Sequence, residues 1–198
     1  MNPLPQPSDL SNALALLRRR LDRFRLHILP GHRVSRWLAR IRVLKNQVAP
    51  RVMAVALRVA LNGWITGRRM QQQRCCVLGC EGKDSIEHYA YCRSFHSLCS
   101  RFLGLTRPNT EYLLPDFVNL DGNASRSWAS DALSGDECSA LRAIGIYALY
   151  RTQNTVRAEA LVADSDVSEL FRGFVRQAVE GHRKSRMLLS RAFKQVRA

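Results

Sequence analysis

Four of the six cysteines and one of the five histidines lie within eighteen residues, in the segment CCVLGCEGKDSIEHYAYC at positions 75–92. Three residues separate Cys76 from Cys80, and a tight turn can close that spacing so that both thiols face one point. His88 and Cys92 are four residues apart, so a short helix places them on one face. Two ligands from a turn and two from a helix predict a tetrahedral zinc site. Thiolate and imidazole ligands favour zinc over hard cations.

The spacing leaves alternatives open for the ligand set. Cys75 can replace Cys76, which lengthens the turn to four intervening residues, and His96 continues the helical stripe of the last two ligands. A disulfide framework is disfavoured, because the N-terminus does not read as a secretory signal and the chain is large enough to form a core. A chance grouping of buried thiols is the remaining alternative. We expect Cys99 and Cys138 to be buried thiols of the core and not ligands.

A short helix in the second half of the segment must position the last two ligands. Asp84 or Ser85 can cap its N-terminus, and Asp84 with Glu87 has the spacing of a capping box. Tyr89 and Tyr91 flank the expected ligands on this helix. Aromatic side chains there either pack against the module or stack on a base, as in RNA recognition.

The rest of the chain predicts helices and no strongly alternating strand. Apolar residues at helical spacing predict helices up to Pro30, from there to Leu44, from Pro50, from Ser139 to about Leu161, and over 167–179 and 189–196. The third of these is apolar nearly all round through Trp64, so we expect it to be buried. Residues 104–137 are rich in turn-forming types, with Trp128 as an expected anchor. No apolar run is long enough for a transmembrane helix.

These patterns predict an all-α fold, a basic helical bundle with a small irregular CCHC module inserted between its N- and C-terminal helices. We divide the chain into a basic helical region at 1–74, the metal module at 75–100, a loop-rich connector at 101–138 and C-terminal helices at 139–198.

The chain is strongly basic, with a net charge of +15 and a pI near 10.6, which implies a polyanionic partner. Residues 1–74 carry 15 Lys and Arg against 2 Asp and Glu, whereas residues 75–168 carry 8 against 12. Arginine suits bidentate phosphate contact. The expected nucleic-acid contacts are Arg18, Arg19, Arg20, Arg23, Arg36, Arg40, Arg68, Arg69 and Arg74.

A second group of bases lies near the C-terminus. For this group, contact with nucleic acid and a solvated helix face both stay open. It consists of Arg183, Lys184, Arg186, Arg191, Lys194 and Arg197.

The segment LNGWITGRRMQQQRCCVLGCEGKDSIEHYAYC, residues 61–92, resembles the zinc-binding segment near the C-terminus of non-LTR (LINE-like) retrotransposon reverse transcriptases. The later run AIGIYALYRTQNTVRA is similar to the helix that follows that segment in the family. Lys83 departs from the pattern, since an acidic residue is common there. The matching positions are Cys76, Cys80, Asp84, Ser85, His88 and Cys92.

The resemblance implies a zinc-binding tail that holds RNA in preference to DNA, without the polymerase itself. No pair of adjacent aspartates of the polymerase type occurs in this chain, and Asn109 stands where a metal-binding Asp of a following endonuclease is needed. No glycine-rich phosphate loop occurs either. The chain is then a piece of a longer element or such a tail reused as a separate protein.

We therefore expect a non-catalytic protein that binds zinc and RNA, because a zinc ion with four protein ligands has no open position for catalysis. The alternative is a structural RNA-binding subunit of a large ribonucleoprotein, such as an organellar ribosome. In that case the basic surface neutralises rRNA. The sequence assigns no compartment.

Overall fold

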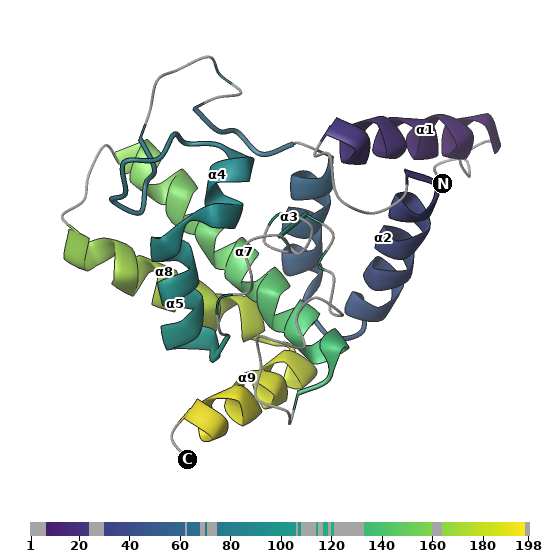
Figure 1. Ribbon diagram of the computed structural model, residues 1–198. Helices are drawn as coiled ribbons and strands as arrows, with labels where there is room; N and C mark the ends of the chain where they lie inside the picture. Colours follow the sequence, from purple (N-terminus) through teal and green to yellow (C-terminus); the bar gives the residue numbers. More distant parts are fainter. Residues whose placement is uncertain are drawn as a thin grey trace.

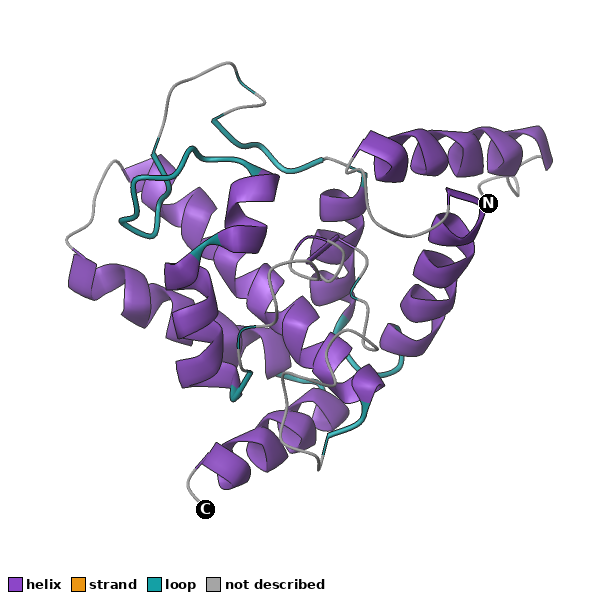
Figure 2. Cartoon of the chain, viewed as in Figure 1, coloured by secondary structure: helices purple, strands orange, loops and turns teal. Residues whose placement is uncertain are grey.

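The computed structural model describes most of the chain, and the fold is all-α, as the sequence predicted. The described residues are 7–23, 30–61, 63–67, 70, 75–105, 107, 114, 117–118, 120, 133–159 and 164–196. Within these ranges there are eight helices and no strand (Figure 2), apart from one antiparallel bridge between Cys75 and Lys83.

Figure 1 shows the helices in the order in which they follow along the chain, and only Cys92 separates α4 from α5 in the metal module. Their bounds are α1 (Pro7–Arg23), α2 (Pro30–Leu44), α3 (Pro50–Ala60), α4 (Ile86–Tyr91), α5 (Arg93–Leu103), α7 (Gly135–Glu159), α8 (Asp164–Val179) and α9 (Arg183–Val196). No helix among the described residues combines the length and hydropathy that a membrane crossing requires. Trp128 lies outside the described residues.

Helices α2 and α3 begin at Pro30 and Pro50, where the sequence predicted them to start. Pro50 occupies the first turn of α3, where its missing N–H costs nothing. The prediction that this helix is buried nearly all round was wrong in part, because Arg51, Leu57 and Arg58 are exposed. Trp64 lies beyond the end of α3, and it is fully buried there. The helix is amphipathic, and its buried face packs on α7.

Helix α7 is the centre of the fold and packs against helices from both ends of the chain (Figure 1). Every residue from 138 to 149 is buried, so this part of the helix is enclosed on all sides. Gly145 permits the close approach of α5, because a Cβ atom there would lie 3.0 Å from the Cys99 Sγ and from Leu103. One hydrophobic core extends from Leu17 of α1 to Ala192 of α9.

Helix α7 begins four residues before Ser139, where the sequence analysis placed its start. Ser134 and Glu137 form a reciprocal cap. The Ser134 N–H donates to the Glu137 carboxylate at 2.9 Å, and the Glu137 N–H donates to the Ser134 hydroxyl at 3.3 Å. This capping box satisfies two N–H groups that otherwise lack partners at a helix start. The Ser-x-x-Glu spacing at 134–137 is visible in the sequence, and the sequence analysis missed it.

Candidate metal centre

The first two predicted ligands, Cys76 and Cys80, lie on a tight turn that is closed by backbone hydrogen bonds. The Cys76 N–H donates to the Gly82 carbonyl at 2.8 Å, and the Gly79 N–H donates to the Cys76 carbonyl at 3.2 Å. Gly79 has a left-handed φ of 75°, which glycine adopts without strain. The Cys75–Lys83 bridge continues the pairing outward. The turn holds the Cys76 and Cys80 thiols on its inner side.

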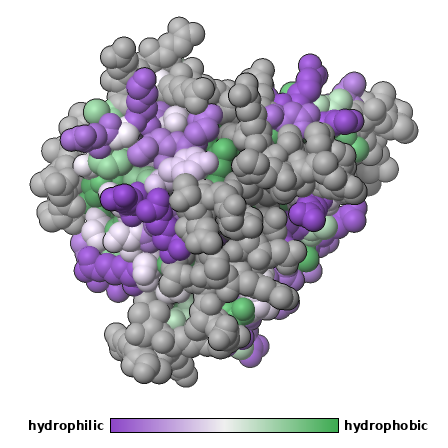
Figure 3. All heavy atoms as spheres, viewed as in Figure 1, coloured by the Kyte–Doolittle hydropathy of each residue, from purple (hydrophilic) through white to green (hydrophobic). Residues whose placement is uncertain are grey.

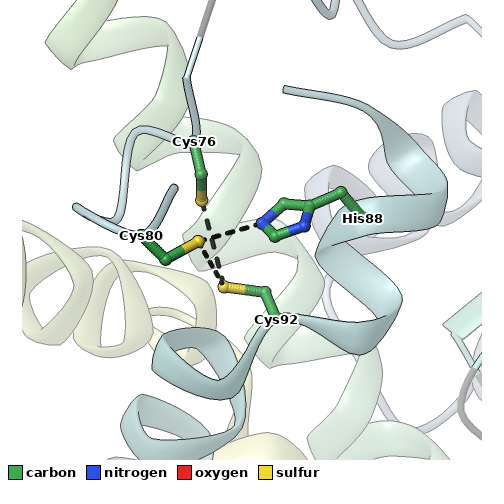
Figure 4. A group of neighbouring side chains, drawn as sticks. All are labelled: Cys76, Cys80, His88 and Cys92. Carbon is green, nitrogen blue, oxygen red and sulfur yellow. Dashed lines mark hydrogen bonds between the residues drawn. The ribbon is translucent and has the colours of Figure 1, made fainter. Parts of the chain in front are cut away.

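The third predicted ligand, His88, lies on α4. The sequence offered Asp84 or Ser85 as the cap of this helix, and the structure shows that Ser85 has that role. Ser85 is the N-cap, and its hydroxyl accepts from the His88 N–H at 3.0 Å. Asp84 lies outside the helix, so the predicted capping box between Asp84 and Glu87 does not form. His88 itself occupies the third helical position, and its imidazole points toward the turn (Figure 4).

The fourth ligand does not lie on the helical face predicted for it. Helix α4 ends at Tyr91, and Cys92 has an extended backbone (φ −63°, ψ 116°) at the junction with α5. The chain therefore bends between the two helices. Even so, the Cys92 thiol stays beside the other ligands (Figure 4).

The structure brings all four predicted ligands together. The ligand atoms of Cys76, Cys80, His88 and Cys92 lie within 4.8 Å of one another. The Sγ atoms of Cys76 and Cys92 are 3.9 Å apart, those of Cys80 and Cys92 are 3.7 Å apart, and the Cys80 Sγ lies 3.1 Å from the His88 Nε2. A tetrahedron with metal–sulfur bonds of about 2.3 Å has sulfur–sulfur edges of about 3.8 Å. The two sulfur–sulfur distances thus match the edges of one coordination shell.

The backbone of Gly82 lies directly beside the imidazole ring of His88. A Cβ atom at this position would lie 2.6 Å from the His88 Nε2, and closer still to two other ring atoms. Real Cβ atoms essentially never approach so closely, so only glycine fits beside this ring. The backbone of the turn therefore restricts where His88 can place its ring.

The pKa values of the three thiols differ because Cys76 and Cys92 share a hydrogen bond and because Cys80 is partly buried. The Cys76 thiol donates to Cys92, which lowers the pKa of Cys92 to about 5 and raises the pKa of Cys76. Burial raises the pKa of Cys80. One thiolate is thus already favoured at neutral pH, and the other two thiols must lose protons when a metal binds.

A buried carboxylate ties the metal module to the core. Asp84 is fully buried, and it accepts hydrogen bonds from the Gly67 N–H at 2.6 Å and from Tyr89 and Gln153 at 2.8 Å each. Its Oδ2 also pairs with the Arg157 guanidinium. Gln153 and Arg157 lie on α7, so Asp84, the residue before the Ser85 N-cap, is anchored to the central helix.

This Asp84 network was missed at the level of sequence, where Asp84 was considered only as a cap. The available signal was the pair of polar side chains, Gln153 and Arg157, that follows the apolar run of α7. Trp64 completes the network, since its indole N–H donates to the Gln153 side chain and its ring stacks on Tyr89 at 5.5 Å. Tyr89 therefore packs in the core, and Tyr91 is 41% exposed.

The other candidate ligands lie apart from the cluster. Cys75 is exposed and outside the group of converging atoms. His96 is buried, and its Nε2 lies 2.8 Å from the Ala90 carbonyl, to which it donates. Burial, together with the charge of Arg142, lowers the pKa of His96 to about 4. Cys99 and Cys138 are buried in the core, as predicted.

The predicted nucleic-acid contacts have different surroundings. Arg18, Arg19 and Arg36 are exposed on α1 and α2, and Arg20 is half-buried. Arg40 is half-buried, and its guanidinium pairs with Asp136 of the α7 start, so part of its charge is already neutralised. Arg68, Arg69, Arg74 and the side chain of Arg23 lie outside the described residues.

Four of the C-terminal bases are exposed on α9, namely Arg183, Lys184, Arg186 and Arg191, and Arg191 pairs with Glu137. The side chains of Lys194 and Arg197 lie outside the described residues. Hydrophilic residues are visible over the region of α1 and α2 and over that of α4 and α5 (Figure 3).

Comparisons with protein-family models, with curated proteins and with solved structures find no match for this chain.

Proposed function

We propose that this chain binds one zinc ion through Cys76, Cys80, His88 and Cys92. The convergence of these four ligand atoms within 4.8 Å is the observation that carries the proposal. Three sulfur donors and one imidazole nitrogen suit zinc, whereas calcium and magnesium prefer oxygen ligands. Four protein ligands complete a tetrahedral shell, so the ion has a structural role and the site has no position for a substrate.

The second part of the proposal is that the zinc-bound protein binds RNA through its arginines. Exposed Arg18, Arg19 and Arg36 give the N-terminal helices a positive surface that can contact phosphates without reading sequence. Tyr91 is exposed beside the metal module and is available for stacking on a base. The preference for RNA over DNA rests on the resemblance to the tail of non-LTR reverse transcriptases, whose machinery holds template RNA.

Metal analysis of the purified chain tests the zinc site. We expect one zinc per chain, and we expect Cys80→Ser and His88→Ala to lose it. Cys75→Ser is a matched control, since this exposed thiol is adjacent to a ligand but outside the cluster, and it should retain zinc. Full zinc retention by both ligand variants contradicts the assignment.

Binding to short single-stranded RNA at several salt concentrations tests the second part. Electrostatic binding predicts that the logarithm of the affinity falls linearly with the logarithm of the salt concentration, by about 0.7 per phosphate contact. A triple Arg18, Arg19 and Arg36 to Ala variant should lower both affinity and slope. Recovery of the chain only in a large particle, with no binding to free RNA, favours the structural-subunit alternative instead.

A further inference from the structure

A cleft of about 500 Å³ lies directly beside the metal cluster. Gly79 of the metal-binding turn lines one side, and Ser168 at the start of α8 lines another. Between them, α5 contributes Arg93, Ser97 and Arg101. We call this hollow the α5 cleft.

The polar groups of the α5 cleft are arranged along one side of a helix. Arg93, Ser97 and Arg101 are spaced by four residues, which places them on one face of α5 over about 12 Å. Ser94, also in the lining, adds a second hydroxyl on the same helix. Guanidinium groups bind phosphate in a bidentate way, and serine hydroxyls can donate to the remaining oxygens.

The electrostatics of the cleft favour an anion. No Asp or Glu is among the residues that line it. In the part of the chain that the structure describes, neither Arg93 nor Arg101 pairs with a carboxylate. Arg101 is held in place by neutral contacts, since its guanidinium lies 5.1 Å from the centre of the Phe102 ring and 3.5 Å from the Ser168 hydroxyl. Both positive charges are therefore available to a ligand.

The walls of the cleft are joined to the metal ligands. Gly79 lies inside the turn between Cys76 and Cys80, and Arg93 directly follows Cys92. An ion that links these cysteines therefore fixes the turn relative to the first residue of α5. The shape of the cleft then depends on the metal.

We propose that the α5 cleft binds a phosphodiester group of single-stranded RNA. This inference rests on the proposed RNA-binding function, and it adds a contact site outside the arginines of α1 and α2. It also explains how the metal module takes part in binding, because a closed zinc site has no ligand position of its own.

The test compares the zinc-loaded full chain with an Arg93→Ala, Arg101→Ala double variant, using a fluorescent oligouridylate and inorganic phosphate as probes. Losing two phosphate contacts should weaken RNA binding about tenfold and reduce the salt slope by about 1.4. Arg172→Ala with Arg176→Ala is the control. It removes the same charge from α8 outside the cleft, and it should change affinity less than about twofold. Zinc content and circular dichroism establish that each variant folds.

Each result decides between the two proposals. If the double variant binds RNA with unchanged affinity and slope, the α5 cleft is refuted and the proposed function stands. If the chain fails to bind RNA but phosphate shifts the NMR signals of the Arg93 and Arg101 side chains, the cleft is an anion site and the RNA function is refuted. If neither probe binds, both are refuted. Removal of zinc with a chelator should abolish the contribution of Arg93 and Arg101, and an undiminished contribution contradicts the metal dependence.

Discussion

Replacing Gly82 by alanine should damage the metal site without touching a ligand. The new Cβ atom would lie 2.6 Å from the His88 Nε2, and the ordinary contact range begins at 3.4 Å. The ring or the turn must therefore move by at least about 0.8 Å. Bonds from zinc to imidazole are about 2.0–2.1 Å long, with a tolerance of roughly 0.2 Å. A shift of that size removes His88 from the coordination shell.

The expected magnitude follows from the energy of structural zinc sites. Zinc-finger peptides bind zinc with apparent free energies of about 10–16 kcal/mol. An even division among four ligands makes the loss of His88 worth about 2.5–4 kcal/mol, or a zinc Kd raised roughly 10²–10³-fold. Competition with a chromophoric chelator measures that Kd. Cobalt substitution, in turn, reports whether a nitrogen ligand has been lost.

Gly173→Ala is the matched control for this substitution. Gly173 lies on the exposed face of α8, and a Cβ atom there meets nothing within 4 Å. Alanine is the better helix former, so this variant should keep its zinc and gain about 0.5–1 kcal/mol of stability. If Gly82→Ala binds zinc as tightly as the parent with an unchanged cobalt spectrum, the argument about the His88 ring is refuted.

Two further predictions concern the core beside the metal. Arg157→Met leaves the buried Asp84 carboxylate without its ion pair, so urea unfolding should show a loss of about 3–5 kcal/mol; a loss below about 1 kcal/mol contradicts the role of this pair. His96 has a pKa of about 4, below its ordinary 6.5, so between these values the unfolded chain binds a proton that the folded chain excludes. Stability should therefore fall as the pH drops from 6.5 to 4, by up to about 3 kcal/mol, and His96→Gln should abolish that part of the loss. Metal release at low pH affects the parent and His96→Gln alike, so it cancels in the difference between their stabilities. If the stability of both proteins depends on pH in the same way, this prediction is refuted.

The cluster of Cys76, Cys80, His88 and Cys92 was predictable because its spacing is local. Cys76 and Cys80 lie on one turn, and His88 and Cys92 lie within five residues of each other, so short-range spacing brings each pair together. The pairing of the two halves needed only a turn and a short helix. Even here the sequence placed Cys92 on α4, because a break in the backbone between two adjacent helices has no strong sequence signal.

The Asp84 network could not be read from spacing. Asp84 and Gln153 are 69 positions apart, and Trp64 and Gln153 are 89 apart. Each residue also has an ordinary local interpretation: Asp84 as a helix cap, Gln153 as a residue within a helix and Trp64 as the end of a helix. Only the packing of α7 against the metal module brings them into one buried hydrogen-bonded group.

The sequence by itself determined the helical class, both ends of α2, the start of α3, the last residues of α8 and α9, and the identity of the four converging residues, since periodicity, caps and short spacings act over a few residues. The tertiary structure alone decided which charges are neutralised, as for Arg40 and Asp136, and which residues line the α5 cleft. These features depend on contacts between segments far apart in the chain. Such contacts arise from the burial of a shared core, which local patterns do not specify.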